Sequence, residues 1–151
     1  MNDSASNPRA PRPTKAADVT AWILQVLAAV ILGQTLFFKF TGAAGARALF
    51  ETLGAEPWGR IGTGVVELVA VVLLLVPGRA ALGALVGLGL MVGAVGSHLT
   101  VLGIEVQGDG GTLFAMAVVT LVASAVVLWI RRAELPILGQ RSAALGAESQ
   151  R

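Results

Sequence analysis

Residues 57–77 read PWGRIGTGVVELVAVVLLLVP, and this stretch decides the fold. It is apolar over about 20 residues, the length that an α-helix needs to cross the hydrocarbon core of a membrane. It starts at Pro57, a residue favoured in the first turn of a helix, and ends at Pro77-Gly78, a turn signal. One carboxylate, Glu67, lies near its middle. A carboxylate at membrane depth is costly, so we expect a partner or a function for it.

The composition of the whole chain indicates the same class of protein. The 151 residues are 55% hydrophobic and 13% charged, with a mean hydropathy of +0.77. Soluble domains carry roughly twice this charged fraction. Three further apolar runs, at residues 19–40, 80–102 and 112–130, are long enough to span a membrane. We therefore predict an all-α membrane protein, an antiparallel four-transmembrane-helix bundle in the lipid bilayer.

The segments outside the four spans are polar. Residues 1–17 are rich in Pro, Ser and Ala and are predicted to form a disordered tail. Residues 133–151 form a second polar tail, which leaves residues 18–132 as the membrane domain. A signal peptide is the alternative for the first span. Its 22 residues exceed the apolar core of a signal peptide, about 7–15 residues, so we favour an uncleaved span.

The segment between the first two spans, residues 41–56, is too polar to cross a membrane. Its apolar residues fall at helical spacing on one face: Ala46, Leu49, Phe50 and Leu53. This pattern predicts a short amphipathic helix in the first outer loop. Such a helix either lies on the membrane surface or caps the bundle, and an ordinary connecting helix is the third alternative.

The positions of lysine and arginine predict the orientation. With both termini in the cytoplasm, that side carries eight of the eleven basic residues, including the pair Arg131-Arg132 that ends the last span. The other side carries three: Lys39, Arg47 and Arg60. The excess of basic residues marks the cytoplasmic side. We therefore predict a multi-pass protein of the plasma (inner) membrane with both termini cytoplasmic.

The sequence also excludes several classes of function. The absence of cysteine excludes disulfides, thiolate metal sites and iron–sulfur ligation by this chain. The net charge is only +2, and no basic cluster interleaved with aromatic residues predicts nucleic-acid binding. One histidine and one buried glutamate are too few for a zinc site, so no metal site is predicted. Without a phosphate-binding loop, nucleophile elbow or dinucleotide motif, we do not expect an enzyme acting on its own.

Three titratable residues are candidates for a polar pocket: Lys39, Glu67 and His98. Counting 1.5 Å of rise per residue from the predicted membrane surfaces places all three in the outer half of the bilayer. A lysine side chain can bend its ammonium group by several ångströms, so a network of Lys39, Glu67 and His98 is within reach. The network would bind a ligand or move protons. In the structural alternative, the lysine and glutamate only fix helix register and the histidine donates a structural hydrogen bond.

The third span is rich in glycine. It contains two GxxxG pairs, Gly83 with Gly87 and Gly89 with Gly93. Small residues let helix backbones approach closely in lipid, where no hydrophobic force drives helices together. We predict that these four glycines pack against other helices, within this chain or in a partner.

Three stretches together resemble the DoxX and DoxX-like family of four-helix integral membrane proteins. They read FFKFTG at the end of the first span, LFETLGAEPWGRIGTGVVELVAVVLLLVP through the second, and MVGAVGSHL in the third. The resemblance covers about residues 20–131. The positions that match the family pattern are Lys39, Gly42, Leu53, Gly54, Glu67 and His98.

The resemblance implies a function only in outline. Some DoxX-like proteins are similar to a subunit of a thiosulfate:quinone oxidoreductase, others are linked to oxidative-stress complexes, and distant relatives are assembly chaperones. It favours a subunit or accessory factor of a redox-linked membrane complex, whose pocket would take a quinone headgroup or a small anion. The alternatives are a non-catalytic assembly partner or chaperone, or a homo-oligomer, docking through the glycine face. A small transporter ranks lower, because four spans are few and no inverted repeat is visible.

Overall fold

The computed structural model describes residues 14–135. Residues 1–13 and 136–151 lie outside the described part, and with them lie most of the two tails that the sequence analysis predicted. The elements, in order, are α1 (Lys15–Thr41), α2 (Ala44–Thr52), α3 (Trp58–Leu75), α4 (Ala80–Ser97), the π-helix η1 (His98–Leu102), α5 (Thr112–Arg131) and the 3₁₀ turn η2 (Arg132–Glu134). The described residues contain no strand, and the predicted all-α, four-helix membrane fold is confirmed.

The first helix begins earlier than the apolar run predicts. Thr14 caps it, because its side-chain oxygen accepts a hydrogen bond from the backbone N–H of Ala17 at 3.3 Å. Asp18 lies in the first turn, where a negative charge favours the helix dipole. Residues 15–17 are therefore helical, which corrects the prediction that they belong to the disordered tail. The helix ends at Thr41 and is capped by Gly42, whose φ of 65° is costly for other residues.

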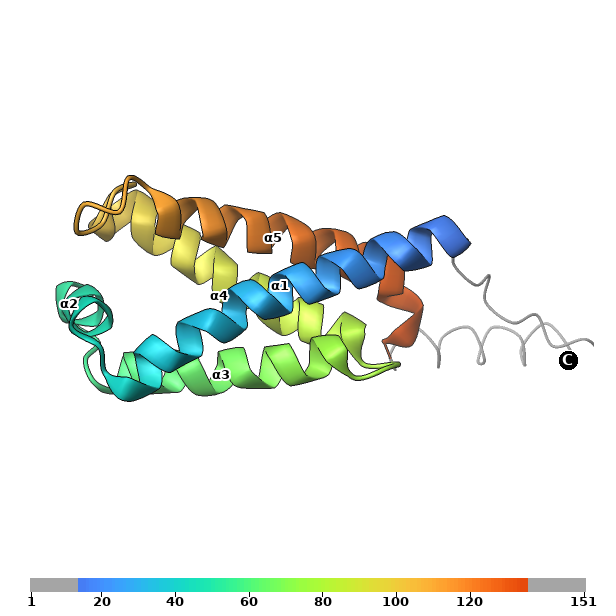
Figure 1. Ribbon diagram of the computed structural model, residues 1–151, viewed down its shortest axis with the longest axis horizontal. Helices are drawn as coiled ribbons and strands as arrows, with labels where there is room; N and C mark the ends of the chain where they lie inside the picture. The colour runs from blue at the N-terminus through green and yellow to red at the C-terminus, as the bar shows by residue number, and fades with distance from the viewer. Residues whose placement is uncertain (1–13, 136–151) are drawn as a thin grey trace, which may run out of the picture.

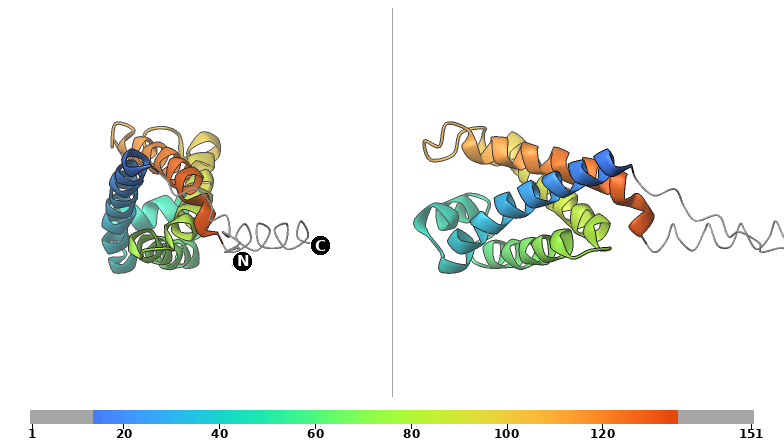
Figure 2. Two further views of the ribbon diagram at one scale, coloured as in Figure 1. Left: turned by 90° about the vertical axis from the view of Figure 1, so that its right-hand side faces the viewer. Right: turned by 45° about the vertical axis from the view of Figure 1, so that its right-hand side comes forward.

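The four long helices form a ring. Helix α1 packs against α3 and α5, and α4 packs against the same two helices on the opposite side. Consecutive long helices run antiparallel (Figure 1), and the end-on view of Figure 2 shows them around a square. Helix α2 lies across the end of the ring that is remote from the described chain ends (Figure 1). We call this the α2 end, and the other the terminal end.

All four long helices, counting α4 with η1 and α5 with η2, are long and apolar enough to cross a membrane. Large apolar side chains such as Ile23, Val30 and Val92 are about 60% exposed on the outside of the ring. In water this surface would be unfavourable, whereas lipid tails cover it without cost. The protein is therefore an integral membrane protein whose outer surface faces lipid.

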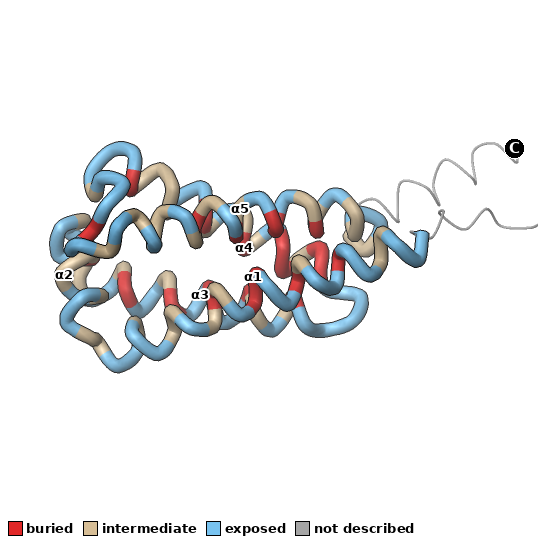
Figure 3. Tube along the Cα trace, turned by 45° about the horizontal axis from the view of Figure 1, so that its top comes forward, coloured by how far each residue is buried: buried red, intermediate tan, exposed pale blue. Residues whose placement is uncertain are grey.

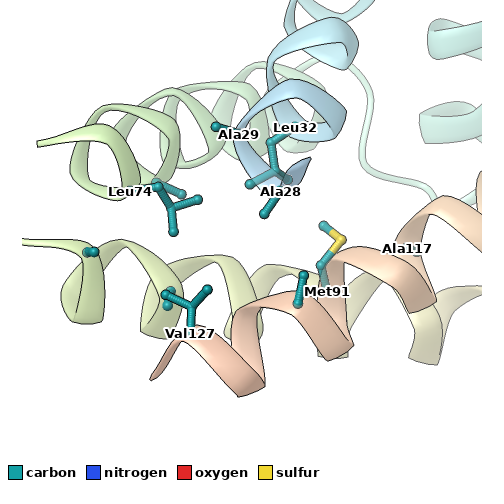
Figure 4. Packing of buried hydrophobic residues seen from close by; sticks show 11 residues of the cluster. Ala28, Ala29, Leu32, Leu74, Met91, Ala117 and Val127 are labelled. Carbon is teal, nitrogen blue, oxygen red and sulfur yellow. The ribbon is translucent and has the colours of Figure 1, made fainter. Parts of the chain in front are cut away.

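The core of the ring is built from small side chains. Seven of the eleven residues in the buried cluster are alanines, which let the helix axes approach closely. Figure 3 shows that buried positions are densest toward the terminal half, and Figure 4 shows the largest members of the cluster meeting between the helices. The cluster consists of Ala28, Ala29, Leu32, Ala70, Leu74, Ala80, Ala84, Met91, Ala117, Ala123 and Val127.

The four glycines that were predicted to pack divide into two pairs. Gly83 and Gly87 are buried, and a Cβ on Gly87 would lie 3.1 Å from the Oγ of Ser124 on α5. Gly89 and Gly93 are exposed, and no atom lies within 4 Å of the position of a Cβ on either. The expectation of packing within this chain is corrected for this second pair. The reason is that α3 and α4 separate toward the α2 end (Figure 1).

A polar cluster that the sequence analysis did not predict joins three helices at the terminal end. Arg131 of α5 forms an ion pair with Asp18 of α1 at 2.6 Å. The side-chain amide of Gln25 is buried, and its orientation is assigned from its hydrogen-bonding neighbours. Its NH₂ group donates to the carbonyl of Leu74 and its oxygen accepts from Arg131, both at 3.1 Å. From the sequence we predicted only that Arg131 helps to mark the cytoplasmic end of the last span. Its partners Asp18 and Gln25 could be identified only once the helices were placed side by side.

Candidate functional site

A cavity of about 990 Å³ lies between the four long helices in the half of the ring toward α2. Its walls are mostly apolar, and Lys39, Glu67 and His98 all line it. It therefore lies between membrane-spanning helices and carries a few polar groups on its wall. This is the general form of a small-molecule site.

The most buried charged group on the cavity wall is Glu67 of α3, which is 4% exposed. One carboxylate oxygen forms an ion pair with the ammonium group of Lys39. The other accepts a hydrogen bond from the hydroxyl of Thr35 at 2.9 Å. Because Thr35 and Lys39 are one helical turn apart, α1 presents both donors on one face. Both oxygens of the carboxylate are thus paired, which makes its burial tolerable.

Arg60 joins the start of α3 to the end of α1 and also forms a second ion pair. The buried guanidinium of Arg60 contacts Glu56 at 2.7 Å and also donates to the backbone carbonyl of Lys39. The hydrogen bonds from Arg60 lower the pKa of Glu56 below its usual value. Sequence reasoning treated Arg60 only as a basic residue of the outer side. The spacing of four between Glu56 and Arg60 was the signal that could have found this pair.

His98 lines the cavity from α4 and η1 but stands apart from the ion pair. It is 5% exposed, and its Nδ1 lies 2.7 Å from the carbonyl oxygen of Gly103. Since a carbonyl only accepts, Nδ1 donates this hydrogen bond, and Nε2 is an acceptor in the neutral form of the ring. The ring also packs edge-to-face on Phe114, with 5.5 Å between centroids.

In residues 14–135 no hydrogen bond joins His98 to Lys39 or Glu67. The sequence suggested a single network of three residues. In the structure Lys39 and Glu67 form a pair, and His98 lies separately on another helix. Three residues with metal-binding side chains do not converge anywhere in this described range. The polar side chains on the cavity wall can donate and accept hydrogen bonds.

Helix α2 covers the cavity with the apolar face that the sequence predicted. Its lining residues include Ala46, Leu49 and Phe50, and Leu53 follows just after the helix. The predicted short amphipathic helix is present, and of the alternatives left open it caps the bundle. Gln107, from the loop before α5, donates to the carbonyl of Gly45 at 3.0 Å and ties α2 to the opposite side of the ring.

The loop between η1 and α5 is organised by Asp109. Its carboxylate accepts hydrogen bonds from the backbone N–H groups of Leu113 at 2.8 Å and of Val106 and Gly111, each at 2.9 Å. These bonds to the charged form, led by those from Leu113 and Val106, lower the pKa of Asp109 below 3.8. The carboxylate thereby caps the first turn of α5, one wall of the cavity.

This geometry predicts a pH dependence of stability. A carboxyl whose pKa is lower in the folded state stabilises the fold above its unfolded pKa of about 3.9, and this contribution disappears as the pH falls through the folded value. We expect Asp109→Ala to lower the melting temperature by about 5 °C at pH 6 and by progressively less below pH 4. Thermal melts of both proteins in detergent from pH 6 to pH 2.5 measure the difference.

The matched control is Glu105→Ala, which removes an exposed carboxylate from the same loop and is expected to change little at any pH. A difference between wild type and Asp109→Ala that stays constant down to pH 2.5 would contradict the assignment of the stabilisation to the ionised carboxylate.

Comparisons of the chain with protein-family models, with curated proteins and with solved structures find no match. The resemblance to the DoxX family therefore stays a prediction that rests on the quoted residues.

Proposed function

We propose that this integral membrane protein is a DoxX-like subunit or accessory factor of a redox-linked membrane complex, and that its cavity binds the uncharged headgroup of a quinone. The observation that carries the proposal is Glu67, an ionisable group at membrane depth that lines a cavity of about 990 Å³. Ionisable residues inside a membrane bundle are costly and usually serve a function. The proposal assigns no catalysis to the chain alone.

Charge balance favours a neutral headgroup over the small anion that the sequence also allowed. Lys39 is paired with Glu67, and Arg60 is paired with Glu56. A free anion would have to compete with Glu67 for the lysine in an environment of low dielectric. A quinone carbonyl, in contrast, only needs one of the remaining ammonium protons of Lys39, and a quinol hydroxyl can donate to Nε2 of His98.

The orientation of the site follows from the basic residues. We place the α2 end at the outer face of the plasma membrane and the terminal end in the cytoplasm, because eight of the eleven basic residues then lie on the cytoplasmic side. The cavity and α2 would then face the compartment outside the cell, and the ion pair between Arg131 and Asp18 would lie near the cytoplasmic surface.

The second candidate function is that of an assembly partner, which docks a helix on the glycine face of α4. Fewer observations support it. Gly83 and Gly87 are used inside the bundle, so only Gly89 and Gly93 are free to meet a partner. A docked helix would have to approach between α3 and α4. We rank this function second, because it gives no role to the buried ion pair.

Binding of decylubiquinone by the purified full-length protein in lipid nanodiscs tests the leading proposal. We expect Glu67→Gln to raise the Kd at least about tenfold, about 1.4 kcal/mol, because a neutral amide no longer holds the ammonium group of Lys39 on the cavity wall. Glu51→Gln, which changes an exposed glutamate on α2, is the control and should leave the Kd unchanged. No binding by wild type, or equal affinity in Glu67→Gln, would remove the proposal.

A further inference from the structure

The cavity opens to the outside of the ring between α3 and α4. These helices meet closely near their connecting turn and separate toward the α2 end (Figures 1 and 2). Three residues of α4, Leu85, Gly89 and Gly93, line the cavity and are also exposed on the outside of the ring. Val66 of α3 does the same and is 42% exposed. Residues that belong to both surfaces mark an opening.

The neighbouring helix pairs are joined by contacts in the same half of the ring. The ring of Phe40 on α1 lies 3.3 Å from the position of a Cβ on Gly64 of α3. Gln34 of α1 donates to the sulfur of Met116 on α5 at 3.0 Å. His98 and Phe114 bring the ends of α4 and α5 together. Phe38 of α1 also lines the cavity and is exposed, but the α3–α4 side carries most of the exposed lining residues and is the side where we expect a molecule to enter from the bilayer.

Two features of this opening suit an apolar chain. Gly89 and Gly93 carry no side chain at two positions of its α4 rim, and no atom lies within 4 Å of either Cβ position. The opening lies along membrane-spanning helices, so lipid tails border it. Inside, His98 is a nearly buried polar residue whose Nε2 is left for a ligand, and the charges of Lys39 and Glu67 cancel.

We propose that the cavity takes a single-chain, uncharged amphiphile directly from the bilayer, through the opening between α3 and α4. The apolar chain lies over Gly89 and Gly93, and the polar head reaches Lys39 and Glu67 inside the cavity. The placement of the head rests on the proposed function, whereas the chain and the route of entry rest on the opening. The hydrogen bond from Gln107 to Gly45 holds α2 across the competing route at the end of the ring.

Photolabelling of the full-length protein tests the route. The protein is reconstituted in phosphatidylcholine vesicles that contain a C16 fatty alcohol with a diazirine on its chain, irradiated, and mapped by mass spectrometry. In wild type we expect adducts on inward-facing residues of the cavity wall, such as Leu90 and Ala94, in addition to lipid-facing residues. In Gly93→Leu the inward adducts should fall at least about tenfold, since a side chain in the opening excludes the chain.

The matched control is Gly62→Leu on α3. Gly62 is exposed, has no atom within 4 Å of its Cβ position and is not part of the cavity lining, so the inward adducts should persist. The wild-type protein alone can contradict the proposal, because adducts confined to outward residues such as Val92 would overturn it. Equal inward labelling in a folded Gly93→Leu protein would also overturn it, as would capture of a protein helix at Gly93 in native membranes.

The two proposals fail in different ways. If the fatty alcohol labels the cavity but decylubiquinone does not bind, the quinone function is wrong and the route from the bilayer stands. If decylubiquinone binds equally well to wild type and Gly93→Leu but less well to Glu67→Gln, the site stands and the route between α3 and α4 is wrong.

Discussion

Replacing Gly83 with alanine is expected to lower the free energy of unfolding by about 2–3 kcal/mol, the cost of overpacking a tightly packed interface. A Cβ at this position would lie 2.8 Å from the backbone carbon of Leu73 and 3.0 Å from the carbonyl oxygen of Ala70, and closer still to the backbone nitrogen of Leu74. These are backbone atoms of α3, so no side chain can rotate away. The two helices must separate, and the alanine core beside them loses contacts.

Reversible unfolding in mixed detergent micelles measures this loss. The matched control is Gly89→Ala on the same helix, where a Cβ meets no atom and alanine also has the better helix propensity. We expect this variant to be as stable as wild type or slightly more stable. Equal stability of Gly83→Ala and Gly89→Ala would show that α3 and α4 do not cross at Gly83.

Removing one partner of the buried ion pair is expected to have the largest effect of any substitution in the cavity. In Glu67→Leu the ammonium group of Lys39, whose side chain is 15% exposed, loses its counter-charge. Leaving an uncompensated buried charge costs about 3–5 kcal/mol. Replacing both residues, in Lys39→Met with Glu67→Leu, removes both charges together. We expect the double variant to recover most of the lost stability.

The double-mutant cycle gives the coupling energy directly. Unfolding of wild type, the two single variants and the double variant is measured under one set of detergent conditions. If the double variant loses as much free energy of unfolding as the two single variants together, the lysine and glutamate act independently. This result would contradict the ion pair between Lys39 and Glu67. The double variant also separates stability from function, because it should fold and yet bind decylubiquinone poorly.

Features that depend on short stretches of chain could be read from the residues alone. The length of each apolar run predicted four spans, since the thickness of a membrane fixes how many helical residues cross it. The helical spacing of Leu49 and Phe50 predicted the apolar face of α2. The pairing of Lys39 with Glu67 was anticipated by depth, because each residue adds a constant rise along a helix.

What the sequence determined by itself was therefore the number of spans and the position of each polar group along its helix. The tertiary structure decided how each helix is rotated and tilted. It set His98 apart from Glu67, brought Gln25 to Arg131, and turned Gly83 inward while leaving Gly93 at an open side. The physical reason is that rise along a helix is a local property of the backbone, whereas rotation and tilt depend on which side chains of separate helices fit against one another.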